Sequence, residues 1–200
     1  MASDRIEQVR QLLARGSATP RQLVEKLGIS QPTLSRMLRA MGADVLRLGS
    51  ARSIQYLLRD ARRGLADMPI YRVDAAGKVG RLGVLTPVAP DGFLMRQDDG
   101  VLLHSDGLPW WLLDMRPQGF VGRAYAARHA QQLGLPASLA EWNDVHALRA
   151  LLAHGHDAVG NLLIGDLAHA AFLGVPPPVP IALADKPHRY ARLAEEAVQG

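Results

Sequence analysis

The chain has 200 residues, of which 48% are hydrophobic and 21% are charged, with a formal net charge of +4 and no cysteine. This composition excludes a disordered chain, and the absence of cysteine excludes disulfide scaffolds, Cys-type zinc fingers, thiol catalysis and iron–sulfur ligation. No apolar run approaches the ~20 residues that span a bilayer, and the N-terminus is charged where a secretory signal is apolar. We therefore expect a cytoplasmic protein with no membrane partner.

The charge is distributed unevenly along the chain. Residues 1–66 carry twelve basic and five acidic side chains, a net charge of +7, whereas residues 67–200 carry eleven basic and fourteen acidic side chains, a net charge of −3. A basic head on a mildly acidic body favours a polyanion as the partner of the head. Charge alone is equally compatible with a solvated, arginine-rich helical surface.

The first thirty residues predict two short helices. Residues 4–16 carry apolar side chains at helical spacing, and Asp4 can cap this segment. A second helix begins after Thr19, which is a typical N-cap, with Pro20 at the first helical position and Gln22 at the third. This arrangement is a capping box, and the missing N–H of the proline costs nothing there.

A third helix is predicted from its cap, Ser30, to about Met41, with Gly42 closing it. Its apolar side chains form one stripe: Leu34, Met37, Leu38 and Met41. The opposite face carries hydroxyls, an amide and arginines and no carboxylate. Its candidate DNA-binding residues are Gln31, Thr33, Ser35, Arg36 and Arg39.

Such a helix, following another across a glycine-containing turn, has the properties needed to enter the major groove of double-stranded DNA. Residues 44–49 and 53–58 then predict a hairpin in the position of a wing, with Arg52 near its tip as a contact to phosphate or the minor groove. Residues 27–36 closely resemble the recognition segment of many bacterial winged-helix regulators. The same periodicity is also compatible with a three-helix module that binds a protein in place of DNA.

The body begins with a predicted antiparallel sheet. Residues 69–85 indicate two strands around a turn at 74–77, followed by a loop at Thr86 and Pro87 and a third strand at 93–96. The glycines here do not form a phosphate loop, because the spacing fails and no helix start follows.

Helices and one further strand complete the expected elements. We expect one of Trp110 and Trp111 to be buried and the other to lie at an interface. The predicted segments are a helix ending near residue 133, a helix at 142–153, a short strand at 160–165, an extended proline-rich stretch at 175–180 and a final helix at 187–199.

No set of side chains in the sequence predicts catalysis or metal binding. His154, His156 and Asp157 are the only metal-like cluster, and their spacing does not match metallohydrolase patterns. Ser105 and His104 are neighbours, which prevents an ordinary Ser–His pairing. We therefore expect no catalytic residue, no metal and no cofactor in this chain.

Two segments of the body carry a family resemblance. Residues 109–123 resemble the apolar "leucine-proline-glycine, then arginine" stretch of the HipA-like serine/threonine kinase toxins, and residues 155–160 resemble their Gly-x-Asp-x-x-Gly turn. The resemblance implies an α+β fold: a winged helix-turn-helix followed by a small antiparallel sheet with helices, like the N-terminal subdomain of that family.

The implied divisions are 1–60 (winged helix), 61–68 (linker), 69–173 (α+β subdomain), 174–186 (proline-rich connector) and 187–200 (start of a helix leading to a kinase core). We expect the linker to be an exposed hinge.

The resemblance implies the DNA-binding, regulatory N-terminal portion of a HipA-like kinase toxin of a toxin–antitoxin system. ATP and magnesium are expected only with a downstream kinase core, because the phosphate loop, catalytic loop and magnesium site are absent here. The chain is then consistent with a truncated product, and its partners would be DNA and its own or a partner's kinase core. Two alternatives remain open: a stand-alone winged-helix transcriptional regulator whose second domain senses a ligand or binds a protein, and an interaction module that blocks a kinase.

Overall fold

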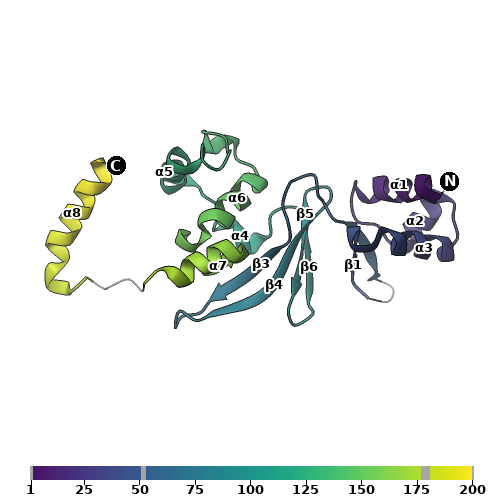
Figure 1. The fold of residues 1–200 in the computed structure, drawn as a ribbon, viewed down its shortest axis with the longest axis horizontal. Helices are drawn as coiled ribbons and strands as arrows, with labels where there is room; N and C mark the ends of the chain where they lie inside the picture. Colours follow the sequence, from purple (N-terminus) through teal and green to yellow (C-terminus); the bar gives the residue numbers. More distant parts are fainter. Residues whose placement is uncertain (1, 51–52, 177–180, 200) are drawn as a thin grey trace.

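The computed structural model describes residues 2–50, 53–176 and 181–199. The chain contains a five-stranded sheet. In Figure 1 this sheet lies between the N-terminal helices on one side and helices α5 (Gly119–His129), α6 (Asp144–His154) and α7 (Gly165–Gly174) on the other. The expected α+β class is therefore confirmed. Among the described residues, no helix is long and apolar enough to cross a membrane.

The N-terminal unit consists of three helices and a two-stranded hairpin. Its elements are α1 (Ala2–Leu13), α2 (Pro20–Leu27), α3 (Gln31–Met41), a short 3₁₀ turn η1 (Gly42–Asp44), β1 (Val45–Leu48) and β2 (Gln55–Leu58). Helix α1 begins before Asp4, so this residue lies in the first turn and the expected cap at Asp4 is wrong. The capping box at Thr19 and Gln22 is confirmed, as is the Ser30 cap.

These three helices share one hydrophobic core. Val9, Leu13, Leu23 and Leu34 are fully buried in it, and Leu58 from β2 completes it. Ala89, which directly follows strand β4 (Val79–Val88) of the five-stranded sheet, packs into the same cluster. The winged helix is therefore joined to the body by packing as well as by the chain.

The large sheet is antiparallel throughout, in the order β6-β5-β4-β3-β7. Its strands are β3 (Met68–Val73), β4 (Val79–Val88), β5 (Gly92–Gln97), β6 (Leu102–Ser105) and β7 (Leu162–Ile164). The expected loop at Thr86 and Pro87 is wrong, because β4 continues through both residues and both are buried. The register shifts between Ile70 and Tyr71, opposite Gly83, which marks a β-bulge.

Helices cover the sheet and enclose the main core with it. They are α4 (Trp110–Leu113), α5 (Gly119–His129), α6 (Asp144–His154) and α7 (Gly165–Gly174), with 3₁₀ turns η3 (Leu139–Glu141) and η4 (Gly155–Asp157). The sheet contributes Ile70, Leu85 and Phe93 to this core, and α6 contributes Leu148 and Leu151.

The second half of the chain contains the paired tryptophans, the proline-rich stretch and the final helix that the sequence indicated. The expectation that one of Trp110 and Trp111 is buried is wrong, because Trp110 is 79% exposed and Trp111 is half-buried. The final helix is present as α8 (Lys186–Gln199), after a 3₁₀ turn η5 (Leu183–Asp185). Residues 177–180 of the proline-rich stretch lie outside the described residues.

The segment after the hairpin is anchored to the body at several points, which differs from a free hinge, although Ala61, Arg62, Gly64, Ala66 and Asp67 are exposed as expected of a linker. Asp60 is 2% exposed, and its backbone N–H donates to the carbonyl of Pro87 at 2.9 Å. Leu65 and Met68 belong to the main core. Arg62 is exposed, although its side chain donates to the carbonyl of Pro90. Arg63 is largely enclosed, and its guanidinium donates to the carbonyls of Asp91 and Gly92. The division of the chain at 61–68 stays a prediction.

Candidate nucleic-acid interface

Helix α3 presents a polar face to solvent and an apolar face to the core. Leu34, Met37 and Met41 are buried and Leu38 is half-buried, as the stripe requires. The exposed residues are Gln31, Ser35, Arg36 and Arg39. Helical spacing therefore brings the amide, one hydroxyl and both guanidinium groups to the solvent side of one helix.

The N-terminus of α3 is fixed by hydroxyl groups. The backbone N–H of Thr33 donates to Ser30 Oγ at 3.4 Å, and the hydroxyl oxygens of Ser30 and Thr33 lie 3.0 Å apart. Thr33 is only half exposed, so its hydroxyl contacts the Ser30 cap and is also partly accessible to a ligand. The first turn of α3 is thus held in one geometry before any ligand arrives.

The arginines of α3 keep their full charge available for a ligand. Within the described part of residues 1–50, ion pairs join Arg10 with Glu7 and Asp44, and Arg21 with Glu25. Arg36 and Arg39 take part in none of these pairs. A guanidinium group that is exposed and lacks an acidic partner can donate in a fork to a guanine edge or a phosphate.

The hairpin occupies the place of a wing. Strands β1 and β2 pair antiparallel, with Leu48 opposite Gln55. Arg52, the residue expected at the tip, lies outside the described residues. Sequence reasoning missed Arg47, which is exposed on β1 opposite Tyr56. Strand alternation did not signal this residue, because Val45, on the same face of the hairpin, packs against the helical core.

Metal ligation plays no visible part in this site. Among the described residues, no group of three or more His, Asp or Glu side chains is arranged to hold a metal ion.

The comparisons with known proteins agree with this two-part structure. The model of the YjjJ-like toxin middle domain matches residues 65–173, which is more than half of the chain. This chain belongs to the YjjJ-like toxin family. A second model, described as a bacterial regulatory protein of the arsR family, matches residues 8–43 of this YjjJ-like chain. That match covers α2, α3 and the second half of α1, so a helix-turn-helix is joined to a YjjJ-like toxin domain.

A curated relative extends the similarity across the junction. Toxin YjjJ of Escherichia coli (strain K12) is 35% identical over 190 residues, which cover 94% of this chain and 43% of the relative. The YjjJ-like chain thus spans less than half the length of that toxin. No solved structure matches it.

Proposed function

We propose that this chain is the DNA-binding and regulatory N-terminal portion of a HipA-like serine/threonine kinase toxin. The observation that carries the DNA-binding part is the solvent face of α3, where Arg36 and Arg39 stand exposed without acidic partners. The match to the arsR-family regulatory protein over residues 8–43 supports the same assignment. The net charge of +7 on residues 1–66 adds the long-range attraction that nucleic acid requires.

Each candidate residue has a distinct role in this proposal. Arg36 forks onto a guanine edge in the major groove, while Gln31, Thr33 and Ser35 bond phosphates or base edges from the first turns of α3. Arg39 contacts phosphate from the same face. Arg52 contacts phosphate or the minor groove from the hairpin, as wings do.

The kinase part of the proposal rests on the toxin family and on two motif segments. Residues 109–123 and 155–160, which resemble segments of HipA-like kinases, both lie within the region matched by the YjjJ-like middle domain. ATP and magnesium would then be bound by a kinase core outside these 200 residues, either in the same chain or in a partner. The reading frames that follow Gly200 test this parentage: a kinase lobe with a phosphate loop and a catalytic Asp, in the same frame or in an adjoining one, supports it, and the absence of such a lobe from both overturns it.

The DNA-binding part is tested by titrating salt against binding to a pool of genomic fragments. Arg36→Ala, Arg39→Ala and Arg52→Ala are compared with wild type, and Arg128→Ala serves as control because Arg128 is exposed on α5. Arg36→Ala should cost about 1–3 kcal/mol at a specific site and relax preference at one base position. Arg39→Ala and Arg52→Ala should weaken all sequences similarly and lower the salt slope by roughly one.

The control variant should bind as wild type does, and all variants should unfold at the wild-type temperature. If the three folded variants bind DNA as tightly as wild type with the same salt dependence, the groove-reading assignment is wrong. The helix-turn-helix would then be a protein-docking surface.

A further inference from the structure

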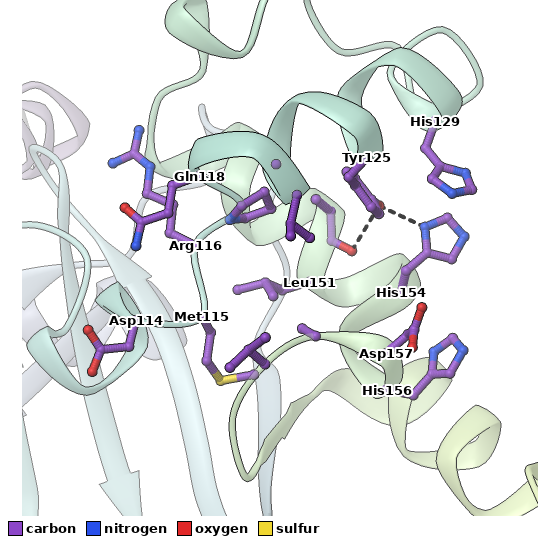
Figure 2. Close-up of a pocket in the computed structure, with 16 residues that line it drawn as sticks. Asp114, Met115, Arg116, Gln118, Tyr125, His129, Leu151, His154, His156 and Asp157 are labelled. Atoms are coloured by element: carbon purple, nitrogen blue, oxygen red, sulfur yellow. Dashed lines mark hydrogen bonds between the residues drawn. The ribbon is translucent and has the colours of Figure 1, made fainter. Parts of the chain in front are cut away.

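A cavity of about 480 Å³ opens in the toxin domain between α5, α6 and η4. Figure 2 shows its wall: His129, His154 and His156 lie on one side, and Asp114, Met115 and Gln118 lie on the other. All lining residues come from the range 114–159, so the cavity has no part in the proposed DNA contacts. Its size and partial enclosure are those of small-molecule sites.

The two segments with family resemblance meet at this cavity. Met115 to Gly122 belong to the first segment, and His156 to Val159 belong to the second. Gly160 ends the second with a φ of +140°, and an added Cβ there would come within 2.9 Å of the Met115 side chain. The tight approach holds the turn after η4 against the segment between α4 and α5.

One end of the cavity gathers hydrogen-bonding aromatic side chains from three elements. Tyr125 Oη on α5 lies 2.7 Å from His154 Nδ1 on α6. The His154 ring centre lies 4.5 Å from that of His129 and 6.4 Å from that of His156 on η4. His156 Nδ1 is buried with no hydrogen-bond partner among the described residues. Three imidazoles thus converge where a polar ligand group could be received.

The hydrogen bond between Tyr125 and His154 leaves the Nε2 atom of His154 able to donate to a ligand. Burial raises the pKa of Tyr125 to about 12, so its hydroxyl keeps its proton at neutral pH. Burial, with help from His129 and His156, lowers the pKa of His154 against the opposing effect of Asp157. If Tyr125 donates to Nδ1, the neutral His154 ring carries its proton on Nε2 and can donate it to a ligand.

Apolar side chains line the middle and one edge of the cavity, between the histidines and the polar wall of Asp114, Arg116 and Gln118. Met115 and Leu151 are buried in its floor, while Val121 and Val159 stand at 72% and 81% exposure along its edge. Side chains of this kind contact a ring or an alkyl chain, and not a sugar phosphate. A ligand with an apolar ring or chain and one polar group therefore matches the apolar side chains and the histidine cluster of this cavity.

The charged side chains that line the cavity, Arg116, Asp114 and Asp157, are either already paired or screened by water. The imidazoles are therefore the groups that can interact with the polar group of a ligand. Arg116 is already held by Asp144 Oδ1 at 3.0 Å and by the carbonyl of Trp142 at 2.6 Å. Asp114 and Asp157 are exposed, so water screens their carboxylates. Burial and the neighbouring imidazoles lower the pKa of His154, and an anion placed beside it would oppose that effect.

We propose that this cavity binds a small aromatic carboxylic acid, with its ring against Met115, Val121 and Leu151 and its carboxylate on the imidazoles of His129 and His154. Binding takes up a proton, because the bound anion raises the affinity of the imidazoles for protons. The facing groups that set this dependence are Tyr125, His129, His154, His156 and Asp157, together with Asp114 and Arg116 across the cavity. Affinity should therefore rise by about tenfold as the pH falls from 8 to 6.

The test uses benzoate as probe, with benzamide and benzylammonium as matched ligands of other charge. Binding to the full chain is followed by calorimetry and by the NMR shifts of the Met115 methyl and the histidine rings. Val121→Trp should fill the cavity edge and abolish benzoate binding, whereas Val101→Trp, at an exposed valine in the turn between β5 and β6, should leave it unchanged. His154→Gln should weaken benzoate about tenfold and flatten the pH dependence, and His188→Gln on exposed α8 should do neither.

Three results would overturn the proposal. The first is that benzoate produces no shift at millimolar concentration at pH 6. The second is that benzylammonium binds more tightly than benzoate, which would make this a cation site governed by Asp114 and Asp157. The third is that Val121→Trp, folded as judged by circular dichroism, binds benzoate as wild type does.

Discussion

The Arg63 guanidinium is ion-paired with the Asp60 carboxylate, with Nε 3.0 Å from Oδ2 and with only 11% and 1% of the two side chains exposed. The same guanidinium donates to the carbonyls of Val88 at 2.9 Å and Gly92 at 2.6 Å, and it lies over the Phe93 ring at 4.6 Å. The link between winged helix and toxin domain is therefore a packed joint. Its orientation is fixed by the turn between β4 and β5.

Arg63 should consequently contribute more to stability than its neighbour Arg62. Arg63→Ala leaves the buried Asp60 carboxylate without its enclosed partner and should cost about 3 kcal/mol of unfolding free energy. Arg62 also bonds Asp60, but its side chain is 68% exposed, so Arg62→Ala should cost only about 1 kcal/mol. Urea unfolding followed by circular dichroism measures both. Equal costs would mean that the joint is not held by Arg63.

The same carboxylate makes stability depend on acidity. Burial alone would raise the pKa of Asp60, but hydrogen bonds and charge from Arg62, with charge from Arg63, outweigh it and lower the pKa. A lowered pKa in the folded state contributes stability that is complete above the unfolded value of about 3.9 and is lost as pH falls below it.

Asp60→Asn should therefore be less stable than wild type at pH 7 and should lose less stability than wild type between pH 5 and pH 3. Unfolding free energies across this range provide the measurement. Asp106→Asn is the matched control, because that carboxylate is fully exposed in the segment after β6. A wild-type acid profile in Asp60→Asn would contradict the account.

Limited proteolysis should find the joint protected. Trypsin cleaves after arginine, and both Arg62 and Arg63 are sites by sequence. Because residues 60–65 are held by carbonyl bonds and by buried Leu65, we expect slow cleavage there. Arg189 and Arg192, exposed on α8, should be cut first. Mass spectrometry of the early fragments identifies the order, and first cuts after Arg62 or Arg63 would restore the hinge that the sequence suggested.

The sequence predicted local features well and distant ones poorly, for physical reasons. The caps at Thr19 and Ser30 depend on residues three positions away, so their signals are local. The carbonyl partners of Arg63 lie 25 to 29 residues further along the chain, and no periodicity encodes them. Helix α7 was missed because its segment, 165–174, is apolar nearly all round and lacks an amphipathic pattern.

The candidate sites divide in the same way. The solvent face of α3 follows from helical spacing within one element, so its residues could be named from sequence. The cavity joins His154 on α6 with His129 and Tyr125 on α5, and it needs the packing of both helices. Sequence reasoning saw His154, His156 and Asp157 only as an unsuitable metal cluster, because His129 and Tyr125 are distant along the chain.

The β-bulge on β4 provides the last prediction, a comparison of two glycines in one strand. Gly83 has a positive φ of 153°, and an added Cβ would overlap the Arg96 carbonyl oxygen and come 2.7 Å from Gln97 Cα on β5. Gly80, three residues earlier, has no atom within 4 Å of such a Cβ. Gly83→Ala should therefore destabilise the toxin domain by about 3 kcal/mol, since either the strand pairing or the backbone must shift. Gly80→Ala should stay within about 0.5 kcal/mol of wild type. Thermal and urea unfolding of both variants decide the matter, and similar stabilities would mean that the bulge yields to a methyl group without cost.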